Sequence, residues 1–350
     1  MIKVIVIDDS ALVRKVISGI LNETDDIEVV ATANDPLAAI KKIKRYKPDV
    51  LTLDLQMPRM DGLTFLRKLM IIFPMPVIVI SSLSKKGSKE ALKSMELGAF
   101  DVVAKPTLGI KNGLNELSQD IVKKIRSSVN ANISSIEKQL KKDKIDKDKN
   151  KKILKFSGDS TIEMIAIGAS TGGTVAVRKI LRKLPAGLPG IIIVLHMPGM
   201  FTSSFAESLN RECRFTVKEA EKGEHFKRNT AYIAPGNYHM IVQRGVSDYY
   251  LKLDNGPKIN HLRPNINKTF NSIANIVAPN CLGILLTGMG KDGAIGLKKM
   301  HDRGATTFAQ DKNSSVVFGM PGEAIRLNAA DKILDLKKIP DNIVRVVDNT

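Results

Sequence analysis

Three side chains in the second half of the chain have the types and spacing of a serine hydrolase site. Ser170 lies in Gly168–Gly172, a segment that follows an apolar run and matches G-x-S-x-G, the turn that exposes a nucleophilic hydroxyl above a sheet. His196 directly ends a second apolar run, and Asp292 lies in a glycine-rich loop after a third. These positions predict nucleophilic attack by Ser170, proton transfer by His196 and orientation of the imidazole by Asp292.

Other interpretations of these residues remain open. A glycine-rich turn between a strand and a helix also cradles phosphate, so a nucleotide site competes with a hydrolase. Against it, His196 stands where a ribose-binding acid is usual, and Gly290-Lys291-Asp292 does not complete a Walker motif. Asp292 could instead cap a helix that begins near Ala294. The order serine, histidine, aspartate also disfavours the α/β-hydrolase fold.

The chain has four further histidines, His225, His239, His261 and His301, of which three have a clear sequence setting. His225 lies in a polar stretch, His239 in a predicted hairpin and His301 among charged helical residues. We interpret all three as structural or surface groups.

A second set of reactive side chains lies in the first half of the chain. Asp8 and Asp9 follow the first apolar run, Asp54 ends the third, Ser81 ends the fourth and Lys105 ends the fifth. In open parallel sheets, functional groups gather beyond the carboxyl ends of the strands. Three converging carboxylates repel one another unless a divalent cation holds them, and Mg²⁺ prefers such ligands. A phosphoryl group on Asp54 would find a metal ion, an ammonium and a hydroxyl nearby.

Both sets require parallel sheets to bring strand ends together. Short apolar runs alternate with stretches of helical period, the pattern of α/β domains. The predicted strands are Lys3–Ile7, Glu28–Ala31, Val50–Leu53, Val77–Ile80 and Asp101–Val103, then Glu163–Ile167, Ile191–Leu195 and Cys281–Leu286. A hairpin is predicted from Thr230–Ala234 and His239–Gln243, which flank Pro235-Gly236-Asn237.

Length and charge indicate how many domains and which kinds of partner to expect. The 350 residues suggest about two domains. The net charge of +18 raises nucleic acid, an anionic membrane and an acidic protein as partners. Residues Lys138–Lys155 hold nine lysines and three aspartates, so nine minus three, or six, of those charges lie there. We predict a flexible linker, acting either as a spacer or as an electrostatic docking segment.

Two widely separated cysteines, Cys213 and Cys281, argue against a disulfide scaffold and fit a reducing compartment. No apolar stretch approaches the length of about 18 residues that a spanning helix needs, and the first residues do not form a signal peptide. We expect a soluble, cytoplasmic protein without membrane insertion.

Residues 1–120 resemble the receiver domain of two-component response regulators. The resemblance rests on Asp8-Asp9, on Asp54 in DLQMPRMDG, on Ser81 and on Lys105-Pro106. It implies that Asp54 accepts the phosphoryl group, that Asp8, Asp9 and Asp54 hold Mg²⁺, and that Ser81 and Lys105 respond to phosphorylation. Val102 stands where many receivers have an aromatic switch residue.

Residues 160–345 resemble the catalytic domain of the chemotaxis protein-glutamate methylesterases, the CheB family. The matching blocks are GASTGGT, LHMPGMFTSSFAESL, APGNYHM, RPNIN, LTGMGKDGAIGLKKM and AQDKNSSVVFGMP. The resemblance implies Ser170 as nucleophile, His196 as base and then acid, and Asp292 as orienting carboxylate. It also implies that Thr171 and Met289 line the site, with an oxyanion donor in the Met289 backbone. Asn265, Asn267 and Gly322 depart from the family pattern.

The two resemblances together imply a fold and an activity. We expect an α/β protein with a doubly wound, five-stranded parallel, flavodoxin-like receiver domain at residues 1–122 and a Lys-rich linker at 123–160. An α/β parallel-sheet methylesterase domain with an added antiparallel hairpin follows at 161–347.

The implied reaction releases methanol from glutamate γ-methyl esters of methyl-accepting chemotaxis receptors and deamidates receptor glutamines, without a cofactor. A chemotaxis histidine kinase would supply the phosphoryl group with Mg²⁺. Phosphorylation would then move the receiver away from the hydrolase cleft. Nucleic acid is not an expected partner, although a DNA-binding response regulator and a catalytically silent receptor-binding module remain alternatives.

Overall fold

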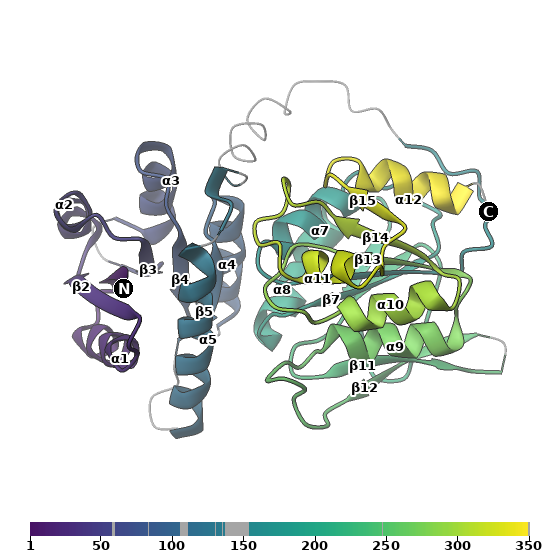
Figure 1. The fold of residues 1–350 in the computed structure, drawn as a ribbon, viewed down its shortest axis with the longest axis horizontal. Coiled ribbons are helices and arrows are strands. Elements are labelled where there is room, and N and C mark those ends of the chain that lie inside the picture. The colour runs from purple at the N-terminus through teal and green to yellow at the C-terminus, as the bar shows by residue number, and fades with distance from the viewer. Residues whose placement is uncertain are drawn as a thin grey trace. The chain divides into compact units, whose positions relative to one another are not determined.

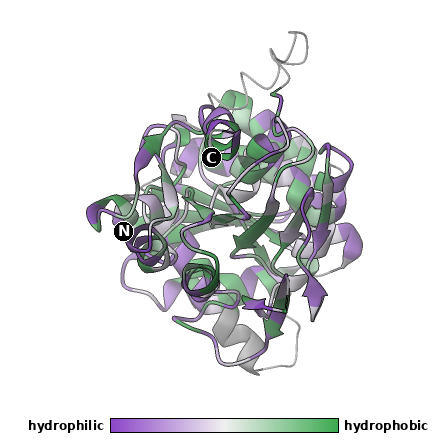
Figure 2. Cartoon of the chain, turned by 90° about the vertical axis from the view of Figure 1, so that its right-hand side faces the viewer, coloured by the Kyte–Doolittle hydropathy of each residue, from purple (hydrophilic) through white to green (hydrophobic). Residues whose placement is uncertain are grey.

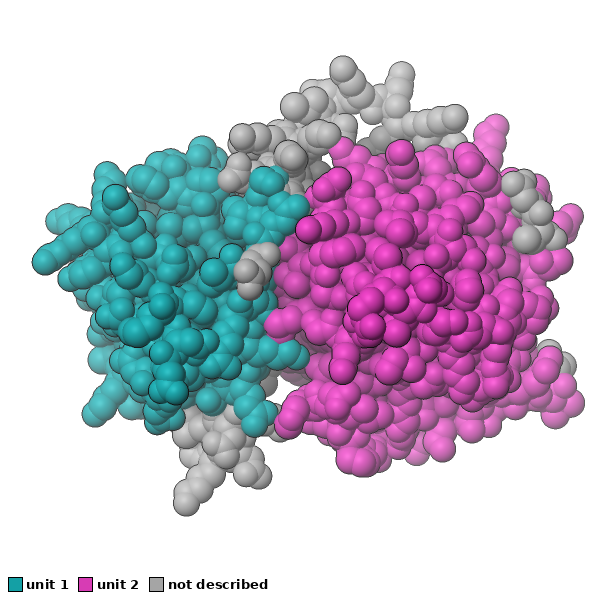
Figure 3. All heavy atoms as spheres, viewed as in Figure 1, with its two compact units in different colours: residues 1–148 teal, residues 149–350 magenta. Residues whose placement is uncertain are grey.

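The computed structural model describes residues 1–57, 60–82, 84–105, 111–129, 131–134, 136, 154–246 and 248–348, without the side chains of residues 111–116. The chain forms two compact units, residues 1–148 and 149–350, which Figure 3 shows in different colours. Each unit is an α/β structure with buried hydrophobic residues in its central strands, as Figure 2 shows for the second unit.

The first unit is built on five parallel strands in the order β2-β1-β3-β4-β5 (Figure 1). The prediction of a five-stranded parallel sheet is therefore confirmed. Its elements are β1 Ile2–Ile7, α1 Ala11–Asn22, β2 Ile27–Ala33, α2 Pro36–Tyr46, β3 Val50–Asp54, α3 Gly62–Ile72, β4 Val77–Ser81, α4 Lys85–Glu96, β5 Asp101–Ala104 and α5 Lys111–Val129.

Short polar side chains determine where four helices of this unit begin. The side chains of Ser10, Asp35, Asp61 and Ser84 each accept a hydrogen bond from a backbone N–H in the first turn of α1, α2, α3 and α4. These N–H groups have no partner within the helix, so each cap stabilises its helix by roughly 1 kcal/mol. The caps fix the loops between strand ends and helices, which carry the polar residues of interest.

The second unit is built on seven parallel strands in the order β15-β14-β13-β6-β7-β10-β8, and the predicted α/β parallel sheet is confirmed. Its elements are β6 Met164–Ala169, α7 Gly173–Leu181, β7 Gly190–Leu195, α8 Gly199–Asn210, β8 Thr216–Glu219, β9 Glu224–His225, β10 Thr230–Ile233, β11 His239–Arg244, β12 Tyr249–Asp254, α9 Ile266–Ile276, β13 Cys281–Leu285, α10 Ala294–Asp302, β14 Thr306–Gln310, α11 Met320–Arg326, β15 Lys332–Leu334 and α12 Ile339–Asp348.

The predicted hairpin of Thr230–Ala234 with His239–Gln243 is wrong, although an antiparallel hairpin exists. β10 is parallel to β7 and β8 in the large sheet, whereas β11 pairs with β12, which also pairs with β9. Ala231, Tyr232 and Ile233 are buried, which suits a strand with neighbours on both sides. The turn between β10 and β11 therefore connects two sheets instead of closing a hairpin.

Helices cover both faces of the large sheet (Figure 1). α9 and α10 pack side by side and share a buried cluster with alternate residues of β6 and β7. α9 lies very close to β6, because a Cβ added to Gly168 would be 2.6 Å from Cγ2 of Ile266. This close approach requires glycine at the end of β6.

The segment between the two units is only partly described. α5 continues to Val129, into the segment expected as a linker, and most of Lys138–Lys155 lies outside the described residues. The domain limits 1–122, 123–160 and 161–347 stay a prediction. Among the described helices, none combines the length and apolar character needed to cross a membrane.

We expect Gly168→Ala to lower the free energy of unfolding of the second unit by about 1–3 kcal/mol, because the added methyl group overpacks the contact with α9. Urea denaturation measures the change. Gly19→Ala is the matched control: Gly19 is exposed in α1 with nothing within 4 Å of an added Cβ, so the substitution should stabilise its unit by about 0.5–1 kcal/mol. Equal effects of the two substitutions would contradict the packing argument.

Candidate functional site

The candidate hydrolase site lies at the carboxyl ends of three adjacent strands. β6 lies between β13 and β7 in the sheet. Ser170 follows β6, His196 follows β7, and the loop after β13 leads to Asp292. The chain leaves β6 toward β7 on one side, whereas β13 lies on the other side. Open parallel sheets form their ligand sites where the strand order reverses in this way.

A tight turn presents Ser170 at the end of β6. The Ser170 N–H donates to the carbonyl oxygen of Thr287 at 3.0 Å, and the Gly173 N–H donates to the carbonyl oxygen of Ser170 at 2.6 Å. Gly172 has a φ of 77°, a left-handed conformation that favours glycine, and precedes α7. The turn therefore fixes the serine backbone between the sheet and the loop after β13.

His196 connects the other two predicted residues. Its Nδ1 lies 3.2 Å from Oγ of Ser170, and its Nε2 lies 2.9 Å from Oδ2 of Asp292. An ionised Asp292 only accepts hydrogen bonds, so Nε2 carries the ring proton and Nδ1 presents its lone pair to the serine hydroxyl. The side chain of His196 is only 10% exposed, which limits competition from water.

Asp292 is buried and surrounded by hydrogen-bond donors. Besides His196, its carboxylate accepts from the backbone N–H groups of Ile266 (2.7 Å), Asn267 (3.1 Å) and Gly293 (3.0 Å), and from Nδ2 of Asn265 (2.9 Å). Burial alone would raise the pKa of Asp292. The hydrogen bond and charge of His196 and the N–H groups of Ile266 and Asn267 outweigh burial and hold this pKa below its usual value.

The alternative that Asp292 caps its own following helix is not what the structure shows. α10 begins after Gly293 without a side-chain cap, whereas the Asp292 carboxylate lies at the first turn of α9. A helix N-terminus favours a negative charge, because its N–H groups point outward without helical partners. The sequence indicated the carboxylate but not the helix that binds it. In the sequence, the nearest indication of this contact is Asn265, where the chain departs from the family pattern.

Thr171 and Met289 lie in segments next to the serine. Thr171 is buried directly after Ser170, and its carbonyl oxygen accepts from the Thr287 hydroxyl at 2.9 Å. Met289 is half-buried in the loop that contacts Ser170, where a Cβ on Gly288 would lie 2.8 Å from Cβ of the serine. Both residues therefore occupy segments packed against the nucleophile.

His225 and His301 make no contact with Ser170, His196 or Asp292 among the described residues, whereas His239 accepts from the backbone N–H of Asn265. His225 is exposed and contacts Asp248 through Nδ1 at 2.6 Å, and His301 contacts Asp302 and Asp331. His239 is fully buried, which the sequence did not indicate. The arrangement of Ser170, His196 and Asp292 can transfer a proton from the serine hydroxyl and stabilise the resulting imidazolium.

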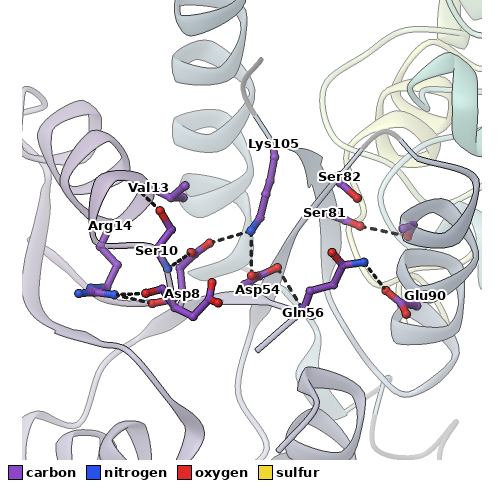
Figure 4. A network of polar contacts seen from close by, with 12 residues as sticks. Asp8, Ser10, Val13, Arg14, Asp54, Gln56, Ser81, Ser82, Glu90 and Lys105 are labelled. Carbon is purple, nitrogen blue, oxygen red and sulfur yellow. Dashed lines mark hydrogen bonds and ion pairs between the residues drawn. The ribbon is translucent and has the colours of Figure 1, made fainter. Parts of the chain in front are cut away.

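The reactive residues of the first unit also converge at strand ends (Figure 4). The Lys105 Nζ lies 2.8 Å from Oδ2 of Asp54 and 3.1 Å from Oδ2 of Asp8. Burial, together with repulsion from Asp54, raises the pKa of Asp8 despite the attraction of Lys105. Burial opposes the charge on Lys105, but the two carboxylates raise its pKa above the usual value. The lysine therefore compensates two buried acids.

Asp8, Asp9 and Asp54 have the geometry of a divalent cation site. Each offers a carboxylate oxygen, and these oxygens lie within 4.8 Å of one another. The Oδ2 atoms of Asp8 and Asp54 are buried, and Nζ of Lys105 lies 3.1 and 2.8 Å from them. Three clustered carboxylates beside a single ammonium fit Mg²⁺, which takes oxygen ligands.

Arg14 supports the acidic turn, a feature that the sequence did not reveal. Its Nη1 donates to the backbone carbonyl oxygens of Asp8 at 2.8 Å and Asp9 at 3.0 Å (Figure 4).

Ser81 is buried at the end of β4, and its hydroxyl donates to the carbonyl oxygen of Gly87. Ser81 therefore lies at the expected strand end, with its hydroxyl directed to α4 (Figure 4).

Val102 is buried on β5, and its carbonyl oxygen accepts from Nζ of Lys124 on α5 at 2.6 Å. Lys124 also forms ion pairs with Asp101 and Asp120. A small aliphatic side chain thus fills the position where many receivers have an aromatic residue, and a lysine joins β5 to α5 there.

Comparisons with known proteins assign both units. Residues 165–343 match the model of the CheB methylesterase family, and residues 4–114 match that of the response regulator receiver domain. A protein of Chromohalobacter salexigens named protein-glutamate methylesterase/protein-glutamine glutaminase is 48% identical over 98% of this chain and 96% of its own length. A protein of Salmonella typhimurium with the same name is 46% identical over 98% of this chain and 96% of its own length.

A solved structure agrees with these matches. The catalytic domain of the Thermotoga maritima CheB methylesterase is 39% identical, with a TM-score of 0.52, and the match covers 53% of this chain and 98% of that domain. The chain therefore belongs to the CheB family of protein-glutamate methylesterases, with a receiver domain preceding the methylesterase domain.

Proposed function

We propose that this protein is a phosphorylation-activated hydrolase that removes methyl groups from glutamate γ-methyl esters of chemoreceptors and deamidates receptor glutamines. Family membership and the names of its relatives support this activity. The observation that carries the proposal is the hydrogen-bonded series from Ser170 through His196 to Asp292. This series provides the nucleophile, the base and the orienting carboxylate that ester hydrolysis needs.

In the first step, Oγ of Ser170 attacks the ester carbonyl carbon while Nδ1 of His196 takes the hydroxyl proton. The imidazolium that forms is stabilised by the ionised Asp292, 2.9 Å from Nε2. The bond to the methoxy group then breaks, and Nδ1 returns its proton to the leaving oxygen, so methanol is released. The glutamyl group remains attached to Ser170 as an ester.

In the second step, water attacks the acyl-enzyme while His196 accepts a proton from it, and the serine leaves with that proton. The product is a glutamate carboxylate. The same sequence applied to a glutamine side chain releases ammonia instead of methanol, so both substrates give the same product. Thr171 and Met289 line the site, and the backbone N–H of Met289 is our proposed donor to the oxyanion of both tetrahedral intermediates.

Phosphorylation of Asp54 is the proposed activating event. Mg²⁺ held by Asp8, Asp9 and Asp54 would offset the negative charge of the incoming phosphoryl group. Lys105 supplies an ammonium beside Asp54, and Ser81 a hydroxyl at the neighbouring strand end. Activation requires that phosphorylation change the free-energy difference between an inactive and an active state by only a few kcal/mol.

The proposal includes partners and location. A chemotaxis histidine kinase donates the phosphoryl group, and methyl-accepting receptors are the substrates, modified on their cytoplasmic helices. We therefore place the protein in the cytoplasm. The domain limits 1–122, 123–160 and 161–347 belong to the proposal, supported by two compact units and by the family matches.

We expect Ser170→Ala to reduce turnover by a factor on the order of 10⁴ or more, because it removes the nucleophile. Methanol release from methylated receptors measures the loss, and circular dichroism checks the fold. Ser208→Ala is the matched control, since Ser208 in α8 hydrogen-bonds to Arg178 and Glu212 and to none of the three proposed catalytic residues. Retained activity in a folded Ser170→Ala protein would exclude Ser170 as the nucleophile.

Asp54→Asn should abolish the increase in methanol release caused by acetyl phosphate, because an amide cannot form the acyl phosphate. Basal release should remain. Asp25→Asn, at an exposed aspartate outside the cluster, serves as the control and should respond as the wild type does. If acetyl phosphate still increased methanol release by Asp54→Asn, a residue other than Asp54 would control the activity.

Removal of Mg²⁺ with EDTA should prevent phosphorylation of Asp54 by acetyl phosphate while leaving basal methanol release unchanged. The three carboxylates belong to the first unit, whereas the proposed hydrolase chemistry uses only serine, histidine and aspartate. Phosphate incorporation and methanol release are measured on the same sample. Loss of basal release with EDTA, restored by Mg²⁺, would show that the esterase itself needs a metal.

A further inference from the structure

The carboxylate of Asp292 is bound by one neutral side chain whose contribution the proposed mechanism does not use. We propose that Asn265 is a positioning residue for the hydrolase, and that its amide holds Asp292 in the orientation that His196 requires. This inference rests on the proposed function, because the orientation matters only if His196 acts as the base. It assigns a role to a residue at which this chain departs from the pattern of the family it resembles.

The donors to Asp292 are of two kinds, backbone N–H groups and side chains. Oδ2 accepts from His196 and from the backbone of Ile266, whereas Oδ1 accepts from the backbones of Asn267 and Gly293 and from Nδ2 of Asn265. Backbone donors are present whatever the side chains are. Among the contacts of Asp292 in the described residues, Asn265 supplies the single side-chain donor besides His196. It contacts the oxygen opposite His196, so it limits rotation of the carboxylate.

Asn265 performs two functions with one amide group. Its Oδ1 accepts from the backbone N–H of Lys268 at 3.0 Å and so caps α9, while its Nδ2 donates to Asp292 at 2.9 Å. The residue is 1% exposed, so neither bond competes with bulk water. An aspartate would keep the cap but could not donate when ionised, whereas a serine hydroxyl can donate and accept. These two functions can therefore be separated by substitution.

A hydrogen bond to His239 fixes the position of the Asn265 backbone. The Asn265 N–H donates to Nδ1 of His239 at 3.2 Å, and Nε2 of His239 donates to the carbonyl oxygen of Pro257 at 3.0 Å. Both ring nitrogens are occupied in the neutral form with the proton on Nε2. The ring is fully buried, and burial lowers its pKa. His239 thus acts as a neutral acceptor that places Asn265 against Asp292.

Few charged groups act on His239 and Asp292. Lys268, Asp254 and Arg263 act on His239, and Lys268 and Asp254 form an ion pair with each other. His196 is the titratable group that acts on Asp292. A new carboxylate at residue 265 would therefore act mainly on Asp292 and His196. It would favour protonation of both, because a like charge raises the pKa of an acid and an opposite charge raises that of an imidazole.

The decisive experiment compares Asn265→Asp with Asn265→Ser in the full chain activated by acetyl phosphate. The substrate is a peptide that contains a glutamate γ-methyl ester, and methanol release is measured from pH 5 to 9. We expect Asn265→Asp to lower kcat/KM at pH 7 by about 10-fold to 100-fold, the size expected for loss of one hydrogen bond to a charged group. Its acidic limb should move to higher pH by about one unit.

Asn265→Ser should stay within about threefold of the wild type, with an unchanged pH profile, because the hydroxyl restores the donor. Asn210→Asp is the matched control: Oδ1 of exposed Asn210 accepts from the Val217 N–H, which an aspartate preserves away from the site. This control should behave as the wild type does. Thermal unfolding of every variant reports whether the cap on α9 is intact.

A wild-type profile for folded Asn265→Asp, or equal losses in Asn265→Asp and Asn265→Ser, would overturn the positioning role. Should Asn265→Asp fail to fold, Asn265→Ser and Asn265→Ala decide the matter. The proposal then requires at least tenfold lower activity in folded Asn265→Ala than in Asn265→Ser, and equal activities contradict it. A wild-type protein that releases no methanol would instead reject the proposed function itself.

Discussion

The binding of the Asp292 carboxylate by the N-terminus of α9 is the interaction on which the candidate hydrolase site depends. A buried carboxylate without donors would take up a proton and lose its value as a partner for an imidazolium. Here the first turn of α9 supplies two backbone N–H groups, Gly293 supplies a third, Asn265 supplies a side-chain donor, and His196 completes the set. The charge therefore persists inside the protein, and it fixes the imidazole in the form that can accept a proton from Ser170.

The close packing of α9 on the sheet makes this arrangement possible. Gly168 at the end of β6 and Gly293 before α10 both face Ile266, the first residue of α9, at distances that leave no room for a side chain. Two glycines from different strand ends therefore let the helix terminus approach the loop that carries Asp292. The packing of the helix and the electrostatics of the carboxylate are consequences of the same contact.

The two units stabilise their buried carboxylates in different ways. In the first unit, Lys105 is the one cation that pairs with Asp8 and Asp54 among the described residues, so the cluster of three carboxylates keeps negative charge for a metal ion. In the second, every oxygen of Asp292 is satisfied by hydrogen bonds from the protein. An incompletely neutralised cluster suits a site that must gain charge, whereas a fully satisfied carboxylate suits a group that must keep its orientation through a reaction cycle.

Strand ends could be predicted from the sequence because apolar runs and the residues after them are local features. This is why the sheet of the first unit, and the neighbouring ends of β6, β7 and β13, were anticipated. The separation of β10 and β11 into two sheets was not anticipated, because a Pro-Gly-Asn turn does not tell whether its flanking strands join one sheet or two.

The roles of Asn265, His239 and Arg14 were also missed, since each depends on a contact between segments far apart or on a side chain reaching a backbone carbonyl. Six of the 18 net charges lie in the lysine-rich segment, so charge gave little information about either site.

The central claim is that Ser170 is a nucleophile activated through His196 and Asp292. Its most direct test is the location of the covalent adduct formed by a fluorophosphonate, which reacts with activated serines. Mass spectrometry of the digested protein should find the adduct on the peptide that contains Ser170, and His196→Ala should prevent its formation. An adduct on another serine, or labelling of Ser170 that persists without His196, would contradict the account.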